Sequence, residues 1–123
     1  MTGDRKLADF RRWALDTLGL LSADPEKQVE CLRSSGVEAE EILLQFDDVM
    51  HVARARVADG SLNHEDYLLL QAVNESANSV SAGPESIWTE GALEEASEWE
   101  AVRTSSRLAK AGLGQSWSQE VGD

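Results

Sequence analysis

The sequence predicts an all-α fold, a single-domain helical bundle of four main helices plus one short helix. Two observations support this prediction. Apolar residues recur every three or four positions over long stretches, as they do along the buried face of a helix. Residues that start and stop helices separate these stretches, and no segment shows the alternating pattern of a strand. The 123 residues are enough for one domain of ordinary size.

The first main helix is expected over residues 4–21, and a short helical segment follows it. The apolar stripe of the main helix consists of Leu7, Phe10, Ala14, Leu18 and Leu21. Asp24 and Pro25 mark the next helix start, because Asp24 can cap the first turn and proline is tolerated at the first helical position. This segment should cover 25–34 and stop at Gly36, a residue that readily adopts the left-handed conformation.

Residues 38–59 form the best-defined helix in the sequence and should be central to the core. When residues are placed 100° apart, its apolar side chains fall within an arc about 120° wide. They are Ala39, Ile42, Leu43, Phe46, Val49, Met50, Ala53 and Val57. Gly60 is expected to end this helix. Phe46 lies at the centre of the apolar arc and is therefore the strongest candidate for the middle of the core.

The second half of the chain should contain two further main helices and a short one. Asn63 is a suitable cap for a helix that Gly83-Pro84 ends. Thr89 can cap a short helix over 90–96. A last helix should follow over 98–111, with Trp99, Val102, Ala109 and Leu113 on its inner stripe.

Glycine residues set the predicted domain boundary near the end of the chain. Gly112 and Gly114 follow the expected last helix and disfavour its continuation. We therefore predict a helical bundle domain over 1–114 and a flexible C-terminal tail over 115–123. Trp117 is the one residue of that tail that can dock onto the bundle.

The net charge limits the kinds of partner. The chain has 23 Asp and Glu residues against 11 Lys and Arg residues, which gives a formal net charge of −12. Such a chain repels nucleic acids and anionic membranes, and it attracts basic surfaces. We expect a protein partner with a basic surface, no nucleic acid and no membrane. No stretch has the length and hydrophobicity of a membrane span or a secretion signal, so a cytoplasmic location is expected.

The charge is also unevenly distributed along the sequence. No Lys or Arg occurs between Arg56 and Arg103, whereas ten acidic residues do. They are Asp59, Glu65, Asp66, Glu75, Glu85, Glu90, Glu94, Glu95, Glu98 and Glu100. Several of them simply suit the positive ends of helices. The alternative is a surface of one sign that steers a basic partner, because helix ends do not explain the missing cations.

A second acidic group is predicted on the outer face of the 38–59 helix, and we interpret it as a partner-binding site. Its residues point away from the apolar arc and are Glu40, Glu41, Leu44, Asp47, Asp48 and His51. An exposed leucine surrounded by carboxylates is typical of an interface anchor with a polar rim. The alternatives are that Leu44 packs on another helix or is one of many scattered surface leucines.

No pattern indicates catalysis, a metal or a cofactor, and we expect none of them. His51 neighbours Asp47 and Asp48 on the helix surface, but a metal centre in a bundle needs ligands from several helices. Cys31 is the single cysteine, so it cannot form an internal disulfide or a site of several thiolates. No glycine-rich phosphate loop or nucleophile motif occurs.

Two segments resemble a known group of proteins. The first contains Asp24-Pro25-Glu26, Val37, Glu41 and Phe46-Asp47-Asp48. The second contains Ile87-Trp88-Thr89-Glu90, Ala92-Leu93, Glu98-Trp99 and Val102-Arg103. Together they resemble small bacterial helical proteins of unassigned function, some of which are similar to immunity proteins of toxin systems. This resemblance implies neutralisation of a partner protein.

One comparison within that resemblance goes against close membership. The acidic four-helix immunity proteins of colicin nucleases are similar in size and charge, but their inhibitory segment contains His-Pro and Tyr-Tyr-Pro. Here Val52 follows His51, and Tyr67 is the only tyrosine. No functional residue can be transferred from that group.

Two functions follow as expectations. The first is an acidic protein-binding module, an inhibitor of the immunity type that neutralises a basic partner such as a bacterial toxin. The alternative is a helical adaptor or regulatory protein with no toxin partner, which can form a homodimer by burying Trp117 or the last helix. The charge of the partner and the salt dependence of binding distinguish the two.

Overall fold

The computed structural model describes the backbone of residues 2–121 and the side chains of residues 6–118. Its elements in chain order are α1 (Thr2–Ser22), α2 (Pro25–Ser35), α3 (Ala39–Ala58), α4 (His64–Ser81), a 3₁₀ turn η1 (Glu85–Trp88), α5 (Glu90–Glu95) and α6 (Ser97–Val121). No strand occurs in the described part, so the predicted all-α fold is confirmed. No described helix has both the length and the hydrophobicity that crossing a membrane requires.

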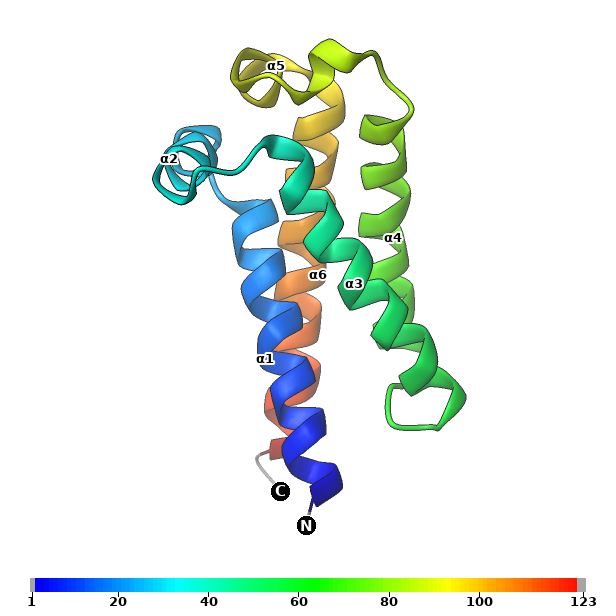
Figure 1. Ribbon diagram of the computed structural model, residues 1–123. Helices are drawn as coiled ribbons and strands as arrows, with labels where there is room; N and C mark the ends of the chain where they lie inside the picture. Colours follow the sequence, from blue (N-terminus) through cyan, green and yellow to red (C-terminus); the bar gives the residue numbers. More distant parts are fainter. Residues whose placement is uncertain (1, 122–123) are drawn as a thin grey trace.

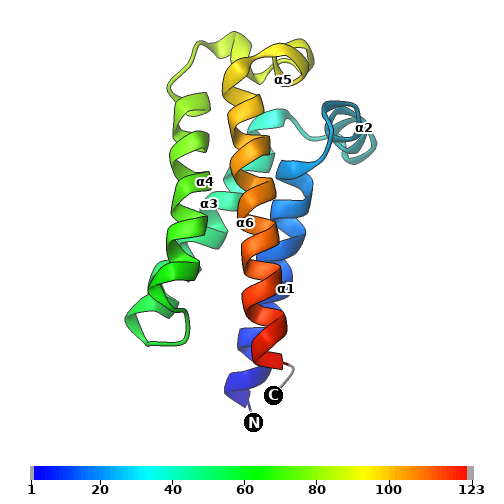
Figure 2. The ribbon, with the colours of Figure 1, turned by 180° about the vertical axis from the view of Figure 1, so that it is seen from behind.

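The four long helices form the bundle, and the two short helices lie across one end of it (Figure 1). Each long helix packs against two others: α6 against α4 and α1, and α3 against α1 and α4. Thus α3 and α6 lie on opposite sides of the bundle, as the front and rear views show (Figures 1 and 2). At the upper end α2 packs on α5, which in turn contacts α6.

Local sequence signals explain most of the helix ends. Gly36 and Gly60 have φ angles of 69° and 83° and end α2 and α3 in the left-handed region, where glycine is favoured. Asn63 accepts a hydrogen bond from the Asp66 backbone N–H at 2.8 Å, and Thr89 accepts one from Ala92 at 3.1 Å. These caps are as predicted. The predicted side-chain cap from Asp24 is wrong, since Asp24 makes no such bond at the start of α2.

The core contains the residues that helical periodicity selected. Phe46 is 1% exposed, and the other predicted core residues of α3 are also buried, except that Val57 is only partly buried. The predicted stripes of α1 and α6 are buried as well, apart from the half-buried Leu7. The pattern of apolar spacing therefore located the core correctly on α1, α3 and α6.

The last helix is longer than predicted, and the prediction of a tail over 115–123 is wrong for the part that the structure describes. α6 continues through Gly112 and Gly114 to Val121. Gly112 serves close packing, because a Cβ atom placed there would lie 2.7 Å from Leu69 Cδ1. Trp117 is only 3% exposed, so it anchors this final part of the helix within the bundle. A bundle boundary at 114 would cut the helix before that anchor.

Candidate protein-binding site between α3 and α4

The six residues of the predicted partner-binding site all lie on the solvent side of α3. Leu44 is 50% exposed, Glu41 is partly exposed, and the others are exposed: Glu40, Asp47, Asp48 and His51. The prediction that Leu44 points away from the core is therefore confirmed. None of the other helices covers it.

Half of this set also borders a groove between α3 and α4, which we call the α3/α4 groove. It has a volume of about 280 Å³. Its lining residues are Glu40, Leu43, Leu44, Phe46, Asp47, Asn74, Ala77, Asn78, Ser81 and Trp88. Glu40, Leu44 and Asp47 are spaced four and three residues apart, so they share one side of the helix. Glu41, Asp48 and His51 do not line this groove.

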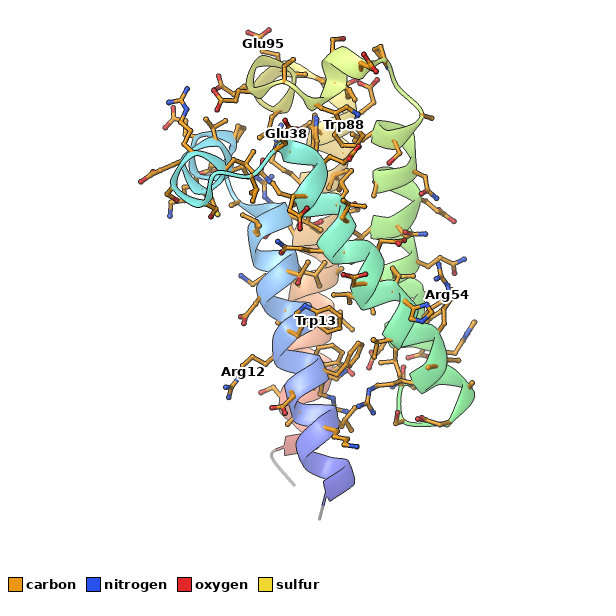
Figure 3. The ribbon with its side chains drawn as sticks, viewed as in Figure 1. Arg12, Trp13, Glu38, Arg54, Trp88 and Glu95 are labelled. Carbon is orange, nitrogen blue, oxygen red and sulfur yellow. The ribbon has the colours of Figure 1, made fainter. Side chains whose placement is uncertain are left out.

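Trp88 forms the upper end of the groove and is held in place by Trp99. Figure 3 shows Trp88 at the upper ends of α3 and α4, near Glu38. Its ring lies edge-on to the buried ring of Trp99, with 6.1 Å between centroids. The Trp99 indole N–H donates a hydrogen bond to the Ile87 carbonyl at 2.7 Å. Because both aromatic rings are fixed by packing, this end of the groove is preformed.

The chemistry of the groove favours a basic and partly apolar ligand. Its two carboxylates come from α3, and the α4 side supplies Asn74, Asn78 and Ser81. No Lys or Arg lines it. Leu44, Ala77 and Trp88 add apolar surface. The sequence predicted the α3 side but missed the α4 side. The only sequence feature that indicates the α4 side of the groove is the polar pair Asn74 and Asn78, which are one turn apart and flank the buried Ala77.

A second groove lies between α2 and α5 and is also acidic. It has a volume of about 590 Å³ and is lined by Glu26, Val29, Glu30, Arg33, Ser34 and Glu94. Arg33 of this lining forms an exposed ion pair with Glu90, which lies outside the lining, and donates to it at 2.8 Å. That hydrogen bond lowers the pKa of Glu90 and raises the pKa of Arg33. Arg33 places a cation in the lining of this groove, so the groove suits a basic ligand less well than the α3/α4 groove.

A buried polar junction connects α1, α2, α5 and α6, and sequence reasoning missed it. The Arg103 guanidinium, 1% exposed, donates to Gln28 Oε1 at 3.0 Å and to the Leu93 carbonyl at 2.9 Å. Gln28 in turn donates to the last-turn carbonyls of α1, Leu20 and Leu21, both at 3.0 Å. Arg103 also pairs with Glu100 at 2.9 Å. Arg103 thus lies inside the structure, on the inner side of α6.

A buried carboxylate fixes the end of α6 to the start of α4. Asp66 Oδ2 accepts hydrogen bonds from the Trp117 indole at 3.0 Å and from Ser116 at 3.2 Å. Trp117 also contacts the ring of Phe10 on α1, with 6.3 Å between centroids. These contacts explain why the final turns of α6 are part of the bundle.

The described residues contain no group of three or more His, Cys, Asp or Glu side chains placed to hold a metal ion. Cys31 is a partly buried free thiol on α2.

Comparison with known proteins found no matching family model, and no similar curated protein or solved structure.

Proposed function

We propose that this chain is a protein-binding module that takes up a basic segment of another protein in the α3/α4 groove. The observation that carries the proposal is Leu44. It is a half-exposed leucine at the rim of a groove whose carboxylates, Glu40 and Asp47, flank it on the same helix. An apolar anchor within a charged rim is the arrangement expected of a binding hot spot.

The functional class that we propose is an inhibitor of the immunity type, which neutralises a basic partner such as a bacterial toxin. Its carboxylates would occupy positions that substrate phosphates take in the partner's basic active site. The net charge of −12 supports fast association with such a partner, because long-range attraction steers the encounter. The resemblance of two sequence segments to immunity-like helical proteins supports the same class.

The test is affinity capture from the native cell with four variants of the chain. The wild type should retain a basic protein, identified by mass spectrometry. Leu44→Ala should lose about 2 kcal/mol of binding, roughly thirtyfold, mainly through faster dissociation. Asp47→Lys should slow association, and the effect should shrink as salt rises.

Two matched controls separate the groove from general charge and hydrophobicity. Glu75→Lys makes the same charge change as Asp47→Lys at an exposed position on α4 outside the groove. Leu68→Ala removes another exposed leucine, one that does not line the groove. If the controls weaken the captured complex as much as the groove variants do, the proposed site is wrong. Capture of an acidic or neutral partner would contradict the proposed partner class.

The alternative function, a helical adaptor or regulatory protein without a toxin partner, draws on a different observation. One stripe of exposed residues on α6, from Ala101 to Ser118, contains no ionisable side chain, whereas Glu100, Arg107 and Lys110 are exposed beside it. Trp117, proposed at first as a contact of such an adaptor, is buried inside the chain and cannot serve. Binding that strengthens with salt would favour the adaptor.

A further inference from the structure

The outer face of α6 carries a continuous stripe of exposed residues without ionisable groups, which we call the α6 seam. It consists of Ala101, Thr104, Leu108, Ala111, Gln115 and Ser118, all exposed. Their spacing alternates between three and four residues, the spacing at which one helix packs along another in a coiled coil. Figure 2 shows α6 nearest the viewer, with α4 on one side and α1 on the other, so the seam is not covered by the chain itself.

The seam differs from the rest of the surface in charge and in hydrophobicity. Leu108 is 67% exposed, more than any other large hydrophobic residue among those described. The neighbouring cations of α6 are directed toward α1. Arg107 donates to the Ser22 carbonyl at 3.2 Å, and Lys110 Nζ lies close to Gly19. A neutral stripe centred on an exposed leucine is thus left without a partner.

The order of residues along the seam is complementary to itself when two copies run antiparallel. With a two-fold axis between Ala109 and Lys110, Leu108 of each copy faces Ala111 of the other. The same axis places Thr104 opposite Gln115 and Ala101 opposite Ser118. Leu108 therefore faces a small residue, the polar Thr104 faces the polar Gln115, and the small Ala101 faces the small Ser118. Each contact occurs twice, as a two-fold interface requires. A parallel pair would instead place each residue against its own copy, so that Leu108 met Leu108.

The surface beside the seam has room for the opposing leucine. A hollow of about 420 Å³ lies in the groove between α4 and α6 and is lined by Glu65, Asp66, Leu69, Gly112, Gln115 and Ser116. Gly112 follows Ala111 directly, so the antiparallel pairing brings Leu108 of the other copy to the edge of this hollow.

At the seam, charge favours a second copy of the chain over a basic partner. A basic partner gains nothing from a stripe without carboxylates and is attracted to the acidic faces. A second copy carries the same net charge of −12 and is repelled by those faces, so the neutral seam is where two copies can approach. We propose that the chain forms an antiparallel homodimer through the α6 seam.

This dimer should be weak and should leave the α3/α4 groove free. The seam spans 18 residues, about 27 Å of helix, and a single helix pair of that length falls in the small class of interfaces below about 1,200 Å². Since α3 lies on the opposite side of the bundle from α6, each copy can bind its partner while dimerised (Figures 1 and 2).

Sedimentation velocity over a hundredfold range of concentration tests the proposal. The mass should rise from 13.4 kDa toward twice that value, and association should strengthen between about 0.05 M and about 0.5 M salt, because screening removes the repulsion between copies. Leu108→Arg should weaken dimerisation at least tenfold. Leu68→Arg, at an exposed leucine of α4 outside the seam, should leave it unchanged. A wild type that stays monomeric throughout overturns the proposal, and so does a dimer that only Leu68→Arg disrupts.

Cysteine pairs test the direction of the helices without changing Leu108. In a Cys31→Ser background, a chain with both Thr104→Cys and Gln115→Cys should form a covalent dimer on oxidation. Either cysteine alone should not, because the two copies of residue 104 would lie about 16 Å apart along the axis, too far for a disulfide. Crosslinking by the single variants would overturn the antiparallel arrangement, and no crosslinking by the double variant would overturn the seam.

Discussion

The buried Arg103 shows how one side chain can connect four helices. Its guanidinium binds Gln28 and the Leu93 carbonyl, and Gln28 binds the end of α1. Nothing in the sequence distinguished Arg103 from other cations of α6, because burial of an arginine depends on acceptors that lie far away along the chain. Gln28 is 75 residues from Arg103. The exposure of Leu44, in contrast, was predictable, because Leu44 lies outside the apolar arc of its own helix.

Replacing Arg103 should be costly because it leaves buried acceptors without donors. Arg103→Met keeps the apolar bulk and removes the donors to Gln28 and Leu93, each worth about 1–3 kcal/mol when unsatisfied. Chemical denaturation should therefore show a loss of roughly 2–6 kcal/mol in the free energy of unfolding. Arg107→Met, at a cation that is half exposed, is the control and should cost far less. Equal losses for the two variants would contradict a buried junction.

Phe46→Ala tests the centre of the core. The side chain is 1% exposed, so its removal leaves a cavity surrounded by the other buried residues of α3 and its neighbours. We expect a loss of roughly 3–5 kcal/mol in the free energy of unfolding. A loss below about 1 kcal/mol would mean that the surrounding helices close over the space. The same measurement on Leu44→Ala should show little change, because Leu44 is at the surface.

At the scale of elements, local signals predicted where most helices begin and could not predict where the last one ends. Asn63 and Thr89 act through their immediate neighbours, and their effect can be read from a few residues. The continuation of α6 depends on Leu69 at Gly112 and on Asp66 at Trp117, which belong to another helix. The α4 side of the α3/α4 groove was missed for the same reason: it exists only after two helices pack.

Truncation separates a docked helix end from a flexible one. A chain that stops after Gly114 loses the buried Trp117 and leaves Asp66 without its indole donor. We expect it to lose at least about 3 kcal/mol of stability, the lower end for removal of a buried large aromatic side chain. A chain that stops after Ser118 keeps Trp117 and should lose much less. If the chain that stops after Gly114 melts at the same temperature as the wild type, the residues after Gly114 form the flexible tail that the sequence predicted.

The ion pair that joins α2 and α5 should make their packing sensitive to acid. The hydrogen bond from Arg33 lowers the pKa of Glu90, so the folded state favours the carboxylate. Its contribution is present at neutral pH and is lost as the pH falls below about 4.3, the ordinary glutamate value, and through the lowered one. Protection factors of α2 amides should fall in that range more than those of α4. Glu90→Gln should remove this difference, and Glu94→Gln should retain it because the ion pair is intact.

For the whole molecule, the excess of carboxylates should make stability depend on salt. Twelve more acidic than basic side chains repel one another in the compact state, and this repulsion is screened as the ionic strength rises. The melting temperature should therefore increase between about 0.02 M and about 0.3 M sodium chloride. Replacing an exposed acidic residue, as in Glu75→Gln, should reduce the rise of the melting temperature with salt concentration. A melting temperature that falls with salt would mean that attractive pairs dominate.

The contact between Phe10 and Trp117 has a consequence for how the protein is made. It joins the first helix to the last, and α6 fills the space between α1 and α4. While the ribosome is still extending the chain, α1, α3 and α4 can form, but the side of the bundle that α6 will cover stays open to water. Their apolar stripes remain exposed until α6 has emerged. Chaperones that hold nascent chains would find their binding surface on α1 and α4 during that interval, and release should coincide with the arrival of Trp117.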